Sequence, residues 1–107
     1  MSKPDSRADG VFKALADPTR RQILRLLGKS EMTAGEIASK FQITAPSMSH
    51  HFNILRNADM VYVRRDGQQL IYSLNTTVFQ EVLSAMMDAL NVGSTGSETA
   101  PENENES

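Results

Sequence analysis

Residues 37–63 constrain the fold more than any other part of the chain. Their order predicts a short helix, a tight turn and a second helix, followed directly by a β-prone stretch. The first turns of that second helix carry small polar residues and two histidines. This order is typical of a helix-turn-helix whose second helix enters the major groove of DNA.

Two further helices are predicted before this segment. The first covers about residues 8–16, with apolar side chains at helical spacing on one face. Asp17 and Pro18 then start a second helix that runs to Leu27, because Asp is an effective N-cap and Pro is favoured at the first helical position. Gly28 is expected to end it in the left-handed conformation. The aliphatic residues of this helix should face the core, with three arginines on the opposite side, namely Arg20, Arg21 and Arg25.

The helix-turn-helix is expected to begin with a capping box. Thr33 and Glu36 stand three residues apart, so that each side chain can bond a backbone N–H at the start of a third helix. That helix should extend to about residue 41 and bury Ile37, Ala38 and Phe41. The fourth helix is expected from residues 44–46 to about residue 57, with an inward face made by Met48, Phe52 and Leu55.

A β-hairpin and a last helix complete the predicted order. Residues 61–64 and 70–74 are β-prone, and the Asp66-Gly67 pair between them is a strong turn signal. Asn75, Thr76 or Thr77 can cap a final helix that reaches about residue 91. The resulting order, ααααββα, predicts a mainly α fold with a small β-hairpin, a winged helix-turn-helix.

Polar side chains gather around the start of the fourth helix. Short hydroxyl, amide and imidazole groups there can reach base edges or phosphates. We predict that bases are read by Ser47, Ser49, His50 and Asn53, and that phosphates are bound by Thr44 and Arg56. The alternative interpretation is an ordinary solvated helix face.

The hairpin is the second candidate DNA contact. Arginine at the tip of such a ribbon can insert into the minor groove, where negative potential is concentrated. The candidates are Arg64, Arg65 and Gln68, with Gln69 beside them, and the sequence does not choose between the two arginines. The alternative is that these arginines only keep the hairpin soluble.

The histidine pair raises the question of a metal site. Adjacent helical positions are about 100° apart around the axis, so His50 and His51 cannot chelate one ion well. The chain has no cysteine and no other histidine. We therefore expect no metal and no cofactor, and we expect His51 to bond a backbone group or to pack at the helix junction. No catalytic set is present either, which predicts a protein that is not an enzyme.

The last helix is apolar over two adjacent stripes, which is wider than a single core contact needs. One stripe can seal the domain while the other contacts a second copy, which predicts a homodimer through the terminal helices. The expected interface residues are Val11, Phe12, Phe79, Val82, Leu83, Met86, Met87 and Leu90. The alternatives are a helix buried only in its own core and a ligand pocket beside the two methionines.

The net charge of −2 is unevenly distributed along the chain. Four glutamates lie in the last ten residues, and the rest of the chain has 11 basic against 9 acidic side chains. We expect a flexible N-terminus over residues 1–7, a DNA-binding domain over residues 8–92 and an acidic disordered tail over residues 93–107. No apolar run is long enough to span a membrane and the N-terminus lacks the apolar core of a signal peptide, so we expect a cytoplasmic protein.

Three motifs resemble the ArsR family of bacterial winged-helix repressors. Residues 15–24, LADPTRRQIL, resemble its opening signature, and residues 49–55, SHHFNIL, resemble its recognition-helix motif, with Phe52 where Leu is usual. Residues 58–61, ADMV, stand where the family has AGLV. The resemblance covers about residues 11–90 and implies a dimeric transcriptional repressor that binds operator DNA, often within its own operon.

Many ArsR-family members sense metals through cysteines in the third helix, or through Asp and His in the last helix. This sequence has neither pattern. Residues 32–38, MTAGEIA, and residues 72–78, YSLNTTV, resemble most the SdpR-like branch of metal-independent autorepressors. The resemblance implies relief by a membrane partner that sequesters the repressor. Two alternatives stay open: a winged-helix module for protein interaction that has lost DNA binding, and a repressor that senses a small molecule at its terminal helix.

Overall fold

The computed structural model describes residues 3–91, with side chains from Arg7 onward, and the expected acidic tail at residues 93–107 lies outside the described residues. The predicted winged helix-turn-helix is confirmed, with one additional short strand. In chain order the elements are α1 (Lys3–Leu15), α2 (Pro18–Leu27), β1 (Met32–Thr33), α3 (Ala34–Ala38), α4 (Ala45–Asn57), β2 (Val61–Asp66), β3 (Gln69–Leu74) and α5 (Thr76–Leu90).

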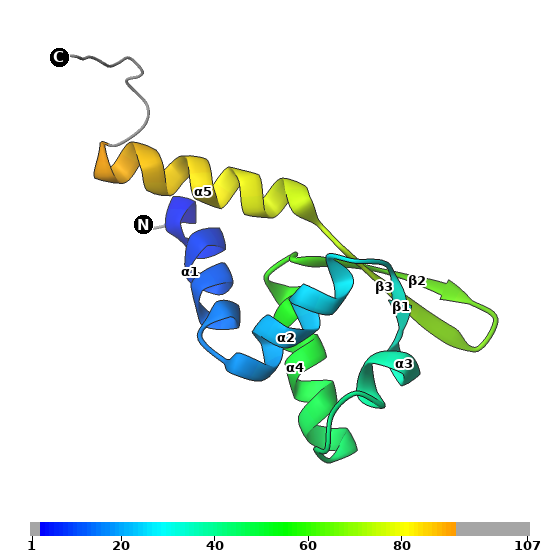
Figure 1. Cartoon of the computed structure of the whole chain (residues 1–107). Coiled ribbons are helices and arrows are strands. Elements are labelled where there is room, and N and C mark those ends of the chain that lie inside the picture. Colours follow the sequence, from blue (N-terminus) through cyan, green and yellow to red (C-terminus); the bar gives the residue numbers. More distant parts are fainter. Residues whose placement is uncertain (1–2, 92–107) are drawn as a thin grey trace, which may run out of the picture.

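The helical layer has α1 and α5 on one side and α2, α3 and α4 on the other. α5 extends away from the sheet with α1 beneath it, and the β2–β3 hairpin projects at the opposite end of the molecule (Figure 1). α2 lies between α1 and α4 (Figure 1) and contacts both. α4 with the hairpin and the terminal helices α1 and α5 therefore lie on different sides of one small body, joined by α2 and by direct contact of α1 with α4.

α1 begins at Lys3, five residues before the expected start, and so includes most of the segment 1–7 that was expected to be flexible. Pro4 does not prevent this, because the first turn of a helix needs no N–H donor. α2 has the expected bounds, and the Asp17 carboxylate caps it by accepting from the Arg20 backbone N–H at 3.1 Å. The expected left-handed cap at Gly28 is wrong: its φ is −65°, and its N–H still bonds the Leu24 carbonyl at 2.9 Å.

The core lies between the helices and the inner face of the hairpin. Its least exposed large side chains come from every layer, namely Val11, Ile23, Ile37, Leu55, Met60 and Val78. Phe52 of α4 stacks on Tyr72 of β3 with ring centroids 4.6 Å apart. Burying one such side chain contributes about 1.5–3 kcal/mol, so these contacts fix α4 firmly against the hairpin. α3 ends at Ala38, three residues before the expected end near Phe41. Of the residues expected to be buried there, Ile37 is buried and Phe41 half-buried, whereas Ala38 is exposed.

The three strands form an antiparallel sheet in the order β1-β3-β2. β1 pairs with β3 through Met32 opposite Tyr72 and Thr33 opposite Ile71. Two residues are too few to give a strand periodicity, which is why the sequence did not predict β1. Gly67 has a φ of +65° at the tip of the hairpin, as the Asp-Gly signal predicts.

Candidate nucleic-acid interface

The start of α4 is fixed by its own N-cap. The Thr44 hydroxyl oxygen accepts from the Ser47 backbone N–H at 3.2 Å, and Pro46 occupies the first turn. The capping box before α3 is also confirmed: Glu36 N–H donates to the Thr33 hydroxyl at 3.0 Å, and Thr33 N–H donates to the Glu36 carboxylate at 2.8 Å. Both helices of the helix-turn-helix thus start where the sequence places them.

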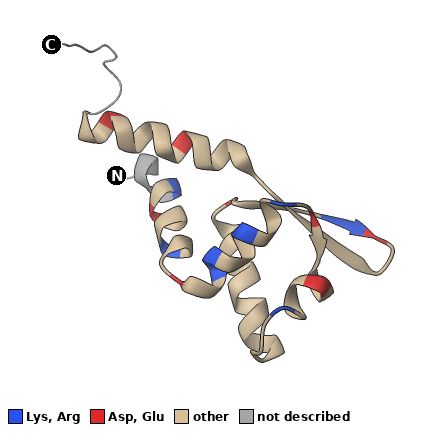
Figure 2. Cartoon of the chain, viewed as in Figure 1, with Lys and Arg blue, Asp and Glu red and all other residues tan. Residues whose placement is uncertain are grey.

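α4 has one buried face and one open face. Met48, Phe52 and Leu55 are buried, as expected. The polar side chains predicted to contact DNA all lie exposed on the same helix or at its cap, namely Thr44, Ser47, Ser49, His50, Asn53 and Arg56. Arg56 is the only Lys, Arg, Asp or Glu of α4, and the helix is tan over most of its length in Figure 2. This helix therefore offers neutral hydrogen-bonding groups, which suit base edges, rather than a strip of charge.

The end of α4 is a Schellman-type turn. Met60 N–H bonds the Leu55 carbonyl at 3.1 Å, and Asp59 N–H bonds the Arg56 carbonyl at 2.9 Å. Asp59 has a φ of +58°, the left-handed region that glycine adopts most easily. In the AGLV pattern that residues 58–61 resemble, glycine stands at the position of Asp59, and glycine is the residue type that this positive φ favours.

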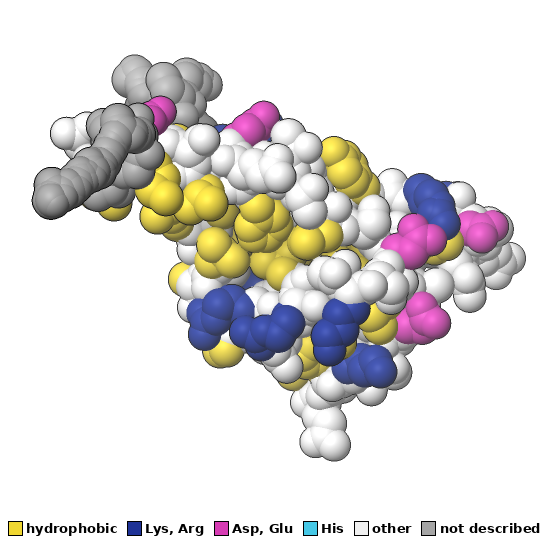
Figure 3. All heavy atoms as spheres, turned by 45° about the horizontal axis from the view of Figure 1, so that its top comes forward, with side chains coloured by type: hydrophobic (Ala, Val, Ile, Leu, Met, Phe, Trp, Pro, Cys, Tyr) yellow, Lys and Arg dark blue, Asp and Glu magenta, His cyan; other side chains and the backbone are white. Residues whose placement is uncertain are grey.

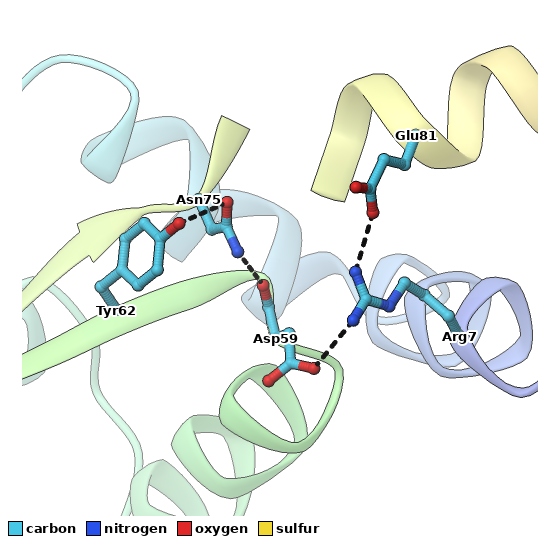
Figure 4. A network of polar contacts seen from close by, with 5 residues as sticks. All are labelled: Arg7, Asp59, Tyr62, Asn75 and Glu81. Atoms are coloured by element: carbon cyan, nitrogen blue, oxygen red, sulfur yellow. Dashed lines mark hydrogen bonds and ion pairs between the residues drawn. The ribbon is translucent and has the colours of Figure 1, made fainter. Parts of the chain in front are cut away.

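A polar network connects this turn to the terminal helices (Figure 4). Arg7 of α1 donates to Glu81 of α5 at 2.8 Å and lies 3.5 Å from the Asp59 carboxylate. Asn75 donates to the Asp59 carbonyl at 2.8 Å and accepts from the Tyr62 hydroxyl at 3.1 Å. Asn75 does precede α5 as its N-cap residue, but its side chain makes no cap bond because it is used here.

One expectation for the polar residues behind α4 is wrong. Arg20 was expected on the outer face of α2, yet it is only 7% exposed. Its guanidinium donates to the carbonyls of Ala14 at 3.0 Å and Lys13 at 2.9 Å, and its Nη1 lies 3.1 Å from His51 Nδ1. Of the two alternatives expected for His51, the structure agrees with packing at a helix junction: the ring lies between α2 and α4 and contacts the Arg20 side chain rather than a backbone group. A buried arginine is tolerated here because acceptors surround it.

The ionisable groups of this junction are shifted in the same direction. Burial lowers the pKa of His51 below 6.5, with Arg20 and His50 adding to the effect and Asp17 opposing it. Burial raises the pKa of Asp17, but the Arg20 and Thr19 backbone N–H groups and the charges of His51 and Arg20 bring it below 3.8 overall. At neutral pH the junction therefore holds an ionised Asp17 and a neutral His51.

The two hairpin arginines differ in their surroundings. Arg64 donates to Glu31 at 2.9 Å and so is paired with an acidic side chain. Arg65 makes no hydrogen bond or ion pair with any residue that the structure describes. Because strand faces alternate, Arg65 shares its face with Val63, opposite Leu70, on the side of the hairpin that packs on α4. Gln68 is exposed at the tip. Arg65 is therefore the better candidate for a DNA contact.

The terminal helices carry an apolar surface. Of the expected interface residues, Val11 and Val82 are buried within the protomer at 1% and 6% exposure, and Phe79 is half-buried. The others are open to solvent, namely Phe12, Leu83, Met86, Met87 and Leu90. Two adjacent grooves of about 230 and 300 Å³ lie between α1 and α5 and share Phe12, Val82 and Met86. Figure 3 shows hydrophobic side chains gathered on one face, above a row of Lys and Arg side chains.

Among the side chains that the structure describes, from Arg7 to Asn91, no three of His, Cys, Asp or Glu lie close enough to hold one metal ion. The same part of the chain contains no helix with the length and apolar character of a membrane span.

Known proteins are similar to this chain in both sequence and fold. The sequence pattern described as bacterial regulatory protein, arsR family, matches residues 17–63. The transcriptional repressor SdpR of Bacillus subtilis is 52% identical over 85 residues, which cover 79% of this chain and 94% of SdpR. A crystal structure of an ArsR family transcriptional regulator aligns with a TM-score of 0.75 at 27% identity, over 80% of this chain and 94% of that one. NolR from Sinorhizobium fredii aligns with a TM-score of 0.63 at 32% identity, over 84% and 90% of the two chains. The chain therefore belongs to the arsR family of bacterial regulatory proteins.

Proposed function

We propose that the protein is a DNA-binding transcriptional repressor that reads an operator with the exposed face of α4. The observation that carries this proposal is the division of α4 into two faces. Met48, Phe52 and Leu55 anchor one face in the core, while the opposite face presents uncharged hydrogen-bonding groups to solvent. A helix held in this way can enter a major groove without moving. Similarity to SdpR and NolR supports the same function.

Each exposed residue has a role that follows from its chemistry. Ser47, Ser49, His50 and Asn53 read base edges, because amide, hydroxyl and imidazole groups form directional bonds there. Thr44 and Arg56, at the two ends of α4, bind phosphates. The hairpin lies beside α4. Arg65, which makes no ion pair with a described residue, enters the minor groove with Gln68 next to it, while Arg64 contributes through phosphate attraction.

The proposed repressor is a homodimer. Phe12, Leu83, Met86, Met87 and Leu90 are large apolar side chains between 38% and 68% exposed on α1 and α5. A second copy of this chain covers such a surface through a two-fold axis, since the same patch then meets itself. Dimerisation also places two copies of α4 on half-sites about one DNA turn apart.

The proposed repressor uses neither a metal cofactor nor a catalytic site. Its chain has no cysteine, and its two histidines are neighbours on α4 whose rings lie 6.0 Å apart and tilted. The Nδ1 atom of one of them, His51, lies 3.1 Å from Arg20 Nη1. Such a protein works where the bacterial chromosome is, in the cytoplasm, and by resemblance to the SdpR-like branch the first operator to test is the promoter of its own operon.

The residue roles are tested by measuring binding to that promoter at several salt concentrations. We expect His50→Ala to lose preference for the promoter over a scrambled duplex by about 1–3 kcal/mol. Arg65→Ala should weaken binding to both duplexes and reduce the salt slope by about 1. Arg64→Ala is the matched control: with Glu31 already beside it, it should change the slope less. Unchanged binding by both the His50 and the Arg65 variants would contradict these assignments.

One observation favours a second candidate, a repressor released by a small molecule. A groove of about 460 Å³ lies at the start of α5, with an apolar floor made by Leu15, Leu24, Leu74 and Phe79. Arg21 and Arg25 line the same groove. The combination of apolar and arginine side chains in this groove suits a ligand with an apolar body and a carboxylate. Such a ligand binds only the folded protein, so it should raise the melting temperature in a thermal-shift series, and Arg25→Ala should reduce that rise.

A further inference from the structure

Arg20 bonds two helices from within α2. Its Nε and Nη2 atoms donate to the carbonyls of Ala14 and Lys13, in the last turn of α1. Carbonyls in the last turn of a helix lack the usual donor four residues on. Arg20 donates to the Ala14 carbonyl and is a second donor to the Lys13 carbonyl, which also accepts from the Ala16 N–H at 3.2 Å. The third arm of the same guanidinium, Nη1, lies 3.1 Å from His51 Nδ1 on α4.

This geometry defines the state of the His51 ring. Guanidinium nitrogens only donate, so Nδ1 must accept, and the proton of the neutral ring is on Nε2. Protonation of Nδ1 in addition to Nε2 would remove the acceptor and place a second positive charge beside Arg20. Three charged or titratable groups face the ring: Asp17 from the turn before α2, 3.8 Å away, Arg20 from α2, and His50 from α4 itself.

We propose that Arg20 is a positioning residue for DNA recognition, which holds α4 at a fixed angle to the terminal helices through neutral His51. This inference rests on the proposed DNA-binding function. α1 belongs to the proposed dimer surface, so the link from α1 through Arg20 to α4 fixes the spacing of the two recognition helices in a dimer. DNA half-sites tolerate little variation in that spacing. The same link makes DNA affinity depend on pH.

The sign of the pH effect distinguishes His51 from its neighbour. Acidification that protonates His51 breaks its bond with Arg20 and loosens α4, so affinity falls. A proton on His50, which lies exposed on the proposed DNA face, adds a positive charge near phosphates and favours binding. At each pH, the affinity of a His51 variant is divided by that of the unsubstituted protein. This ratio cancels the contribution of His50, because His50 is present in both proteins.

The experiment measures binding of the full chain between pH 5.5 and 8 to a duplex that the unsubstituted protein selects from a random pool. His51→Asn keeps an acceptor near the Nδ1 position but cannot titrate, so we expect its affinity at pH 7.5 to stay within about threefold and its advantage to grow as the pH falls. Arg20→Lys keeps the charge with one donor group instead of three, and we expect about tenfold weaker binding at pH 7.5. Lys29→Arg, an equally conservative exchange of an exposed basic residue just after α2, is the matched control and should bind as the unsubstituted protein does.

Two results overturn the proposal: a pH-independent affinity ratio between His51→Asn and the unsubstituted protein, or normal binding by an Arg20→Lys variant whose circular-dichroism spectrum is native. If Arg20→Lys does not fold, the His51→Asn ratio decides alone. Nitrogen-15 NMR of the free protein separates this inference from the proposed function, because it needs no DNA. We expect the His51 ring to carry its proton on Nε2, and an Nδ1-protonated ring overturns the proposal even where DNA binding is normal. If no duplex is selected, the proposed function and with it the positioning role of Arg20 fail together, whatever the ring state.

Discussion

At the scale of single residues, the surroundings of a side chain decide its structural role more than its polarity does. Arg20 and Arg21 are adjacent and chemically identical, yet one is buried against α1 and α4 and the other is exposed. Asp59 is an ordinary acidic residue in composition, but its φ of +58° puts it in a position that suits glycine. Its ion pair with Arg7 is exposed on both sides and contributes only about 0–1 kcal/mol. The backbone, rather than the charge, therefore decides what this residue does for stability.

Replacing Asp59 by Gly should stabilise the protein. A non-glycine residue in the left-handed region costs about 1–2 kcal/mol, and the greater freedom of glycine in the unfolded chain offsets about half of that gain. We expect the free energy of unfolding to rise by about 0.5–1 kcal/mol, measured by urea denaturation. Asp59→Ala is the control, because it removes the carboxylate without relieving the backbone. Stabilisation by Ala equal to that by Gly would show that the carboxylate, and not φ, is responsible.

Acid should destabilise the protein in two stages. His51 has a lowered pKa in the folded protein, so the unfolded chain binds its proton first and stability falls as the pH drops below 6.5. Asp17 also has a lowered pKa, so its contribution, present above 3.8, is lost as the pH falls further. Urea denaturation of His51→Asn should lack the upper stage, and that of Asp17→Ser, which keeps an N-cap, should lack the lower one. If both variants follow the pH profile of the unsubstituted protein, other groups cause the acid sensitivity.

At the scale of elements, local chemistry predicted most of the fold. The Asp17 cap, the capping box at Thr33 and the Asp-Gly turn each act within four residues, so one sequence was enough to place α2, α3 and the hairpin. What depends on distant partners was not predictable. β1 exists only because β3 lies beside it, and Asn75 bonds Asp59, 16 residues away, instead of capping α5.

The candidate site divides in the same way. Exposure of the polar face of α4 followed from helical periodicity, because Met48, Phe52 and Leu55 define the opposite face. The difference between Arg64 and Arg65 could not be predicted from periodicity, because it depends on Glu31, which lies 33 residues before Arg64. The burial of Arg20 likewise needed the carbonyls of α1 and the ring of His51 to be in place.

The capping box gives a prediction at this scale. Thr33→Ala removes the hydroxyl that bonds Glu36 N–H, and we expect it to destabilise the protein by about 1 kcal/mol in urea denaturation. Thr33→Ser retains that hydroxyl and should cost a few tenths of a kcal/mol at most. Equal losses in the two variants would mean that the methyl group of Thr33, and not the cap, matters at this position.

At the scale of the whole molecule, the surface of the terminal helices differs in character from that of α4 and the hairpin. α1 and α5 present large apolar side chains to solvent, whereas the exposed side chains of α4 and the hairpin are mainly polar, with Arg56, Arg64 and Arg65 among them. Arg20 and the network around Asn75 connect the two regions inside one chain. In a dimer, these connections would fix the positions of the two α4 helices relative to the contact made by α1 and α5.

A charge on the apolar surface should separate the proposed dimer. Leu83 is 55% exposed on α5, and Leu83→Glu would bury a carboxylate at the contact. We expect sedimentation at micromolar concentration to give the monomer mass, with DNA affinity about 100-fold lower or weaker still because only one half-site is then bound at a time. Ser84→Glu adds the same charge on another side of α5 and should leave the dimer intact. A dimeric Leu83→Glu variant would place the contact elsewhere.

The claim that α4 reads a specific operator is tested most directly by selecting duplexes from a random pool with the unsubstituted protein, then measuring affinity for the enriched sequence. We predict a two-fold symmetric consensus whose half-site centres are about 10 base pairs apart. Its affinity should exceed that for a scrambled duplex by about 1,000-fold or more at physiological salt. A pool that yields no enriched sequence, or equal affinity for the enriched and scrambled duplexes, would contradict a sequence-specific repressor.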